Sequence, residues 1–90
     1  MRFDWDAANV GHLWDRHQLR PETVEAAMLN HPRRYAVQIV GDERRVLYVG
    51  ETQGGELLLI VTTQRKRKIR VATAHPASRK QRRFFMENKR

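Results

Sequence analysis

The last third of the chain contains the residues best suited to chemistry on a phosphate group. His75 is followed by a run of basic side chains, and Arg70 precedes it by five positions. A histidine exchanges protons near neutral pH, and arginines bind phosphate oxygens through a planar fork of donors. These residue types and spacings predict a phosphate-ester site with four candidate catalytic residues: His75, Arg70, Arg79 and Arg82.

Cleavage of RNA without a metal uses the 2′-hydroxyl as nucleophile. The reaction needs one group that accepts its proton, another that protonates the 5′-oxygen, and cations that stabilise the charged phosphorane. His75 is expected at a strand end just before a helix N-terminus, which offers free N–H groups to an anion. Arg79 and Arg82 are one turn apart on that helix. We therefore expect these three residues and Arg70 to gather around one phosphate; the alternative for His75 is an ordinary loop residue.

A second basic group is the run from Arg65 to Lys68. Cations spaced along a surface neutralise phosphates and release counterions. Strand alternation predicts Lys68 and Arg70 on one face with Ala72 and Ala74, whose small side chains leave room for a ligand. The alternative for this run is a hairpin tip whose charges discourage edge pairing. We expect four further residues to bind RNA: Arg45, Lys68, Lys80 and Arg83.

The remaining histidines and aromatic residues favour structural roles. His17 continues a helical stripe formed by Val10, Leu13 and Trp14, so a packing role is favoured over catalysis. No spacing of His, Asp or Glu predicts a metal site, and no cofactor is expected. Packing is also the expected role of four aromatic side chains: Trp5 and Trp14 in the core, and Tyr35 and Tyr48 in strands, where stacking on a base is the alternative.

Charge is distributed unevenly along the chain. The 18 Lys and Arg exceed the 10 Asp and Glu, giving a net charge of +8. Residues 1–45 are balanced, so the whole excess lies in residues 46–90. Such asymmetry indicates a nucleic acid, an anionic membrane surface or an acidic protein as partner, and a solvated basic face is the alternative. The absence of cysteine excludes disulfides and thiol catalysis and fits a cytoplasmic protein. No apolar run approaches a membrane span or a signal peptide.

Local patterns predict one α+β domain over residues 1–90. Asp6 is a good N-cap, Pro21 suits the start of a helix, and Ser78 with Gln81 forms a capping box. Between the second and third helices the apolar period changes from 3.6 to 2. The expected elements are helices from 7 to 17 and from 21 to before Pro32, strands over 35–40, 45–52, 57–63 and 68–74, and a helix from about 79. This order describes two N-terminal helices, a four-stranded antiparallel meander and a C-terminal helix. The first strand is expected to be half-buried and the third to be buried on both faces.

With this order of elements, the sequence resembles the BrnT family of toxins from bacterial toxin–antitoxin modules. The resemblance rests on three segments: Phe3-Asp4-Trp5-Asp6, Glu43-Arg44-Arg45 with Gly50, and Ile69 through Arg82. It implies a RelE-like ribonuclease fold, RNA cleavage that arrests translation with possible ribosome association, and a BrnA-type antitoxin that carries the DNA-binding domain. Four residues match basic positions of the family: Arg45, Arg70, Arg79 and Arg82.

Three residues depart from the family pattern. His75 stands where arginine is usual, Phe85 where tyrosine is common, and Gln18 where glycine follows the histidine. An arginine-to-histidine change removes a permanent phosphate clamp and inserts a titratable group, which either strengthens acid–base chemistry or marks a weakened nuclease. The alternative to a ribonuclease is a non-catalytic module that docks nucleic acid or antitoxin on the same basic face.

Overall fold

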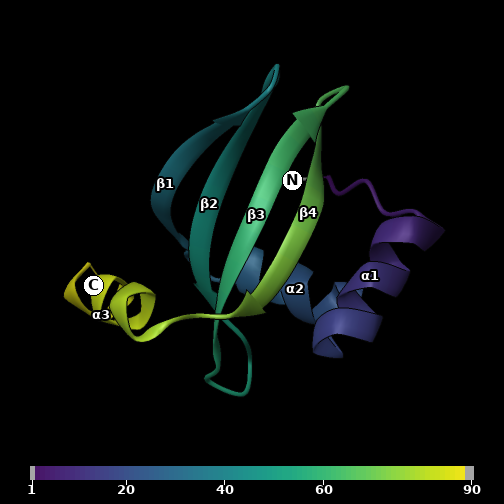
Figure 1. The fold of residues 1–90 in the computed structure, drawn as a ribbon. Coiled ribbons are helices and arrows are strands. Elements are labelled where there is room, and N and C mark those ends of the chain that lie inside the picture. Colours follow the sequence, from purple (N-terminus) through teal and green to yellow (C-terminus); the bar gives the residue numbers. More distant parts are fainter. Residues whose placement is uncertain (1, 89–90) are drawn as a thin grey trace.

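The computed structural model describes residues 2–88, so Met1, Lys89 and Arg90 lie outside the described residues. It confirms the predicted α+β fold (Figure 1). The elements in chain order are α1 (Ala7–His17), α2 (Pro21–Met28), β1 (Arg33–Val40), β2 (Glu43–Glu51), β3 (Leu57–Arg65), β4 (Lys68–Pro76) and α3 (Arg79–Glu87).

The four strands form one antiparallel sheet in the order β1-β2-β3-β4. Residues of α1 and α2 pack with Leu58 and Ile60 of β3 on one face, whereas Phe85 of α3 packs with Leu59 and Val61 on the other. β3 is therefore buried on both faces, as its uninterrupted apolar sequence predicts. Figure 1 shows α2 behind the sheet, α3 in front of it, and α1 beside the edge formed by β4.

Side-chain caps fix the beginnings of two helices. The Asp6 carboxylate accepts a hydrogen bond from the backbone N–H of Asn9, whose side chain accepts one from the backbone N–H of Asp6. Ser78 and Gln81 make the same reciprocal pair at α3. Each pair satisfies donors that a helix leaves free in its first turn, and the predicted helix starts are confirmed.

Two apolar predictions are wrong. Trp14 is 46% exposed and lies beneath the guanidinium of Arg20, 5.0 Å from the ring centroid. The far half of β1 is also uncovered, with Val37 44% and Ile39 68% exposed. Val37 pairs with Val46 on the sheet face that carries α1 and α2, and these two helices leave it exposed. The sequence pattern predicts the alternation of the strand but not how far the helices extend over the sheet.

A β-bulge in β4 overturns the simple alternation expected there. Val61 pairs with Thr73 and Thr62 pairs with Val71, so Ala72 is the extra residue. Ala74 consequently packs in the core beneath α1 and α2, and it does not share a face with Arg70 as predicted. The bulge also turns His75 to the face that carries α3, where it lies opposite Leu59.

No helix formed by residues 2–88 is both long enough and apolar enough to cross a membrane.

Candidate functional site

Helix α1 runs along the outer edge of β4, and polar contacts join the two elements in sequence order. We call this row the α1–β4 seam. It consists of four pairs: Asp6 with Arg70, Asn9 with the carbonyl of Val71, His12 with Thr73, and His17 with His75.

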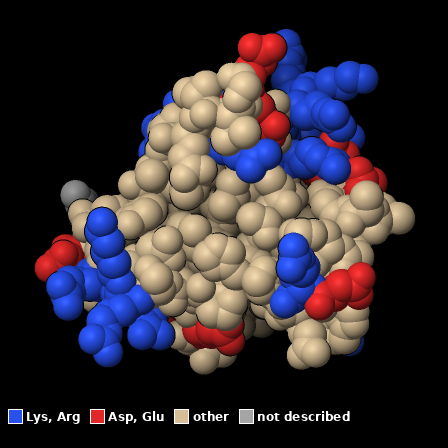
Figure 2. Space-filling model, in the orientation of Figure 1, with Lys and Arg blue, Asp and Glu red and all other residues tan. Residues whose placement is uncertain are grey.

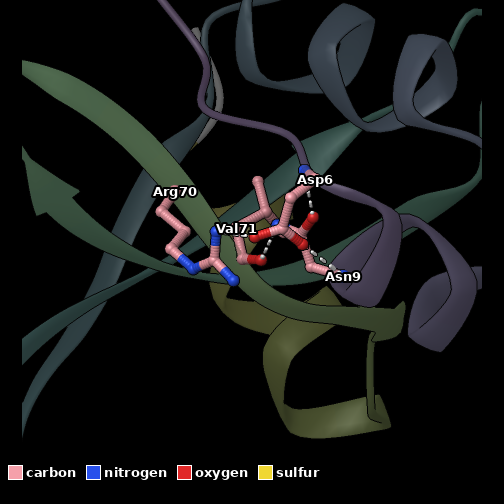
Figure 3. A network of polar contacts seen from close by, with 4 residues as sticks. All are labelled: Asp6, Asn9, Arg70 and Val71. Atoms are coloured by element: carbon pink, nitrogen blue, oxygen red, sulfur yellow. Dashed lines mark hydrogen bonds and ion pairs between the residues drawn. The ribbon is translucent and has the colours of Figure 1, made fainter.

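The first pair joins the start of α1 to the middle of β4. Arg70 Nη1 donates to Asp6 Oδ2 over 2.8 Å (Figure 3). The backbone hydrogen bond from Asn9 lowers the pKa of Asp6 most, and the hydrogen bond from Arg70 lowers it further. Arg70 therefore takes part in a specific ion pair, in addition to the catalytic role expected for it. A guanidinium has five N–H donors, so further donors of Arg70 can reach a second anion.

Asn9 provides the second contact from a buried position. Its side chain is part of the capping box, and its Nδ2 donates to the backbone oxygen of Val71 over 3.2 Å (Figure 3). Asn9 is 6% exposed, so these bonds satisfy polar groups that water does not reach easily. Asn9 therefore fixes the distance between α1 and β4.

The third and fourth pairs bring histidines together. His12 Nε2 lies 3.4 Å from Thr73 Oγ1, and the ring centroids of His17 and His75 are 5.6 Å apart, tilted by 48°. His75 Nδ1 is 3.0 Å from the backbone oxygen of Pro76. Burial lowers the pKa of His17, and the charges of His75, His12 and Arg16 lower it further. The lowered pKa favours the neutral form of His17 beside His75.

The structure places the four candidate catalytic residues on two elements: Arg70 and His75 in β4, and Arg79 and Arg82 in α3. After Pro76 the chain crosses toward β1 and β2, where Phe85 is buried and anchors α3. Arg70 and His75 make contacts in the α1–β4 seam, whereas Arg79 and Arg82 are exposed on α3. Their expected grouping around one phosphate stays a prediction.

Basic side chains from β3, β4 and α3 form two separate groups on the surface. The tip group is at the β3–β4 turn and contains Arg65, Lys66, Arg67 and Lys68; the helix group is on α3 and contains Arg79, Lys80, Arg82 and Arg83. All eight are exposed and form no ion pair within residues 2–88. Figure 2 shows Lys and Arg gathered at these two ends, with mainly uncharged surface between them. A polyanion that contacted both groups would cross this uncharged surface.

Arg45 is on β2, on the face that carries α3. Its Nε lies 3.4 Å from Glu43 Oε1, which is an ion-pair distance, but the contact lacks the geometry of a hydrogen bond. Arg45 is thus a partly buried cation between the two basic groups.

The family model that matches this chain describes a ribonuclease toxin, BrnT, of a type II toxin–antitoxin system, and it covers residues 5–81. The chain belongs to the BrnT family. The match includes the whole α1–β4 seam and ends inside α3, so Arg82 and Arg83 lie beyond it. Membership implies RNA as substrate and a protein antitoxin as partner. A search of curated proteins found no match.

Sequence reasoning missed the positions of His12 and His17 in the α1–β4 seam. His17 was expected to pack, and it is half-buried, but its ring lies beside His75 rather than in an apolar environment. Nothing local in the sequence indicates this proximity, because the two rings are 58 positions apart and meet only when α1 lies along β4. Within residues 2–88, no three His, Asp or Glu side chains are grouped so as to hold a metal ion.

Proposed function

We propose that this BrnT family protein is an endoribonuclease that cleaves RNA without a metal, with His17 and His75 as its proton-transfer groups. The observation that carries the proposal is the 5.6 Å separation of the two ring centroids where α1 lies along β4. Two adjacent imidazoles supply the base and the acid that transesterification requires.

In this proposal His17 is the base, and its lowered pKa supports that role. Neutral His17 takes the proton of the 2′-hydroxyl while the 2′-oxygen attacks the adjacent phosphorus. Protonated His75 gives its proton to the 5′-oxygen as the P–O bond breaks. The products are a 2′,3′-cyclic phosphate and a free 5′-hydroxyl, and the reaction leaves His17 protonated and His75 neutral. His75 Nδ1 lies near the Pro76 carbonyl, which leaves Nε2 for the substrate.

Cations on both sides of the histidines hold the RNA in this proposal. Arg70 uses guanidinium donors that Asp6 does not occupy to stabilise the phosphorane, and Asp6 orients it. Arg79 and Arg82 are exposed on α3 and bind a neighbouring phosphate in this proposal. Four residues extend the RNA track: Arg45, Lys68, Lys80 and Arg83. Affinity for RNA should therefore fall steeply with salt.

In the cell, we expect this activity to act on mRNA in the cytoplasm, free or engaged by the ribosome, and so to inhibit translation. The cognate antitoxin neutralises it, and contact with DNA occurs only through the antitoxin. These expectations follow from membership of a type II toxin family.

The test is cleavage of a defined single-stranded RNA by the purified protein in EDTA, with analysis of the product ends. We expect 2′,3′-cyclic phosphate ends from the wild type and none above background from His75→Ala. His31→Asn is the matched control: His31 is exposed, lies outside the α1–β4 seam and has a positive φ, which asparagine tolerates.

Three results would contradict parts of the proposal. Intact RNA both alone and on ribosomes, with no growth arrest on expression, would exclude a ribonuclease. Salt-dependent RNA binding without turnover, weakened by Arg70→Ala, would indicate a non-catalytic binding module. Cleavage that EDTA abolishes and Mg²⁺ restores would exclude the metal-independent mechanism.

A further inference from the structure

The outer edge of β1 is an exposed strand with apolar side chains. β1 pairs only with β2 in the described sheet, so its other edge has no strand partner there. Three of its residues are large, apolar and exposed: Val37 at 44%, Ile39 at 68% and Val40 at 49%. An uncovered apolar edge strand is a template for pairing with another chain, and monomeric proteins usually protect such edges with charge, proline or a bulge.

An open groove of about 990 Å³ adjoins this edge. Val46, Tyr48 and Ile69 are among the residues that line it, and Val37 continues the groove because it pairs directly with Val46. Tyr48 packs against the core beneath α1 and α2, so the groove lies on the face opposite His75. The groove shares Arg70 with the proposed RNA-cleaving site, but neither His17 nor His75 lines it.

The groove has a basic border. Arg34, Arg44, Arg65 and Arg70 line it together with Asp42 and Glu43, which leaves an excess of positive charge. An occupant with apolar and acidic side chains complements this lining. RNA fits poorly, because aliphatic side chains line the groove and two carboxylates border it. A second copy would place Arg34 and Arg44 against the same basic border, and like charges in contact oppose association.

We propose that an extended, apolar and acidic segment of the antitoxin adds a fifth strand to the β1 edge and places alternate side chains in this groove. The inference rests on the proposed toxin function, since family membership supplies the protein partner. Backbone hydrogen bonds to β1 provide affinity in this mode, and the groove selects the side chains. The contact anchors the antitoxin on the sheet face away from the histidines.

The experiment titrates the antitoxin encoded beside this chain into the full-length protein by calorimetry. Ile39→Thr keeps a β-branched residue but removes apolar area, and Arg44→Glu reverses one border charge. We expect each to weaken binding at least tenfold. Met86→Gln is the matched control, because Met86 is 60% exposed on α3, and it should change affinity less than twofold.

Hydrogen exchange locates the contact independently. Bound antitoxin should slow exchange of β1 backbone amides. Unchanged affinity in both folded variants, or protection confined to α3, would overturn the proposal. So would β1 protection that rises with protein concentration in the absence of antitoxin, since a second copy would then be the occupant. RNA cleavage by free Ile39→Thr should match that of the wild type. If the wild-type protein does not cleave RNA, the proposed function is refuted, but the measured antitoxin binding still tests the docking proposal.

Discussion

The two edge strands of the sheet, β4 and β1, differ in whether other parts of the chain cover them. At β4, backbone hydrogen bonds join Ile69 to Arg2 and Asp4, and α1 covers the strand with the polar contacts of the seam. At β1, the far half of the strand is bare and apolar. One edge is closed by the chain itself and carries titratable groups, whereas the other remains available to a partner.

In our proposals, the two edges of this small domain have different roles: catalysis at β4 and partner recognition at β1. The closed edge holds His17 and His75 in a fixed relation, which proton transfer requires. The open edge at β1 contributes nothing to that geometry and is free to bind the antitoxin. Substitutions at the two edges should therefore affect different measurements.

The largest expected effect is on cleavage. His17→Ala or His75→Ala should lower kcat/KM by about 10²–10⁴-fold, the usual contribution of a positioned acid or base. The double variant should be little worse than either single one, because the two groups act as a unit. Ile39→Thr at the open edge should cleave normally. A double variant whose loss is the product of the two single losses would show that the histidines act independently.

The next largest effect is on stability at the closed edge. Asn9→Ala removes the cap partner of Asp6 and leaves the buried carbonyl of Val71 without its donor. We expect a loss of about 2–3 kcal/mol in the free energy of unfolding by urea denaturation. Asn30→Ala is the matched control: Asn30 also donates to a backbone oxygen, that of Glu51, but is exposed, so the loss should stay below about 1 kcal/mol. Equal losses in the two variants would mean that the seam contact is unimportant.

A smaller effect concerns the end of α1. Gln18 has φ 54° and ψ 37°, a left-handed conformation in which a Cβ is unfavourable. Gln18→Gly should therefore stabilise the fold by about 0.5–1 kcal/mol. Gln53→Gly is the control for relief of backbone strain. Gln53 is not among the residues with positive φ, so glycine should not increase the free energy of unfolding there. Destabilisation by Gln18→Gly would show that its side chain makes a contribution larger than the strain.

Local signals predicted most of the fold. The Asp6–Asn9 and Ser78–Gln81 caps depend on residues three positions apart, and both helix starts are confirmed. The site was less predictable, because its geometry arises from tertiary contacts. The bulge at Ala72 decides which face His75 occupies, and alternation alone gives the opposite result for Ala74.

The remaining errors have the same origin. The exposure of Val37 depends on how far α1 and α2 extend over the sheet, and the neighbours of His17 depend on where α1 lies against β4. The position of α3 likewise depends on the packing of Phe85 against β2 and β3, which the local sequence does not reveal.

The most direct test of the central claim is the pH dependence of kcat/KM for RNA cleavage by the wild type and the two histidine variants. Because the pKa of His17 is lowered and His17 must be neutral to act as base, activity should fall on the acid side of about pH 6.5, the ordinary histidine value. The residual activity of His17→Ala should lack this acid limb, whereas the residual activity of His75→Ala should retain it. An acid limb that persists in His17→Ala would contradict the account.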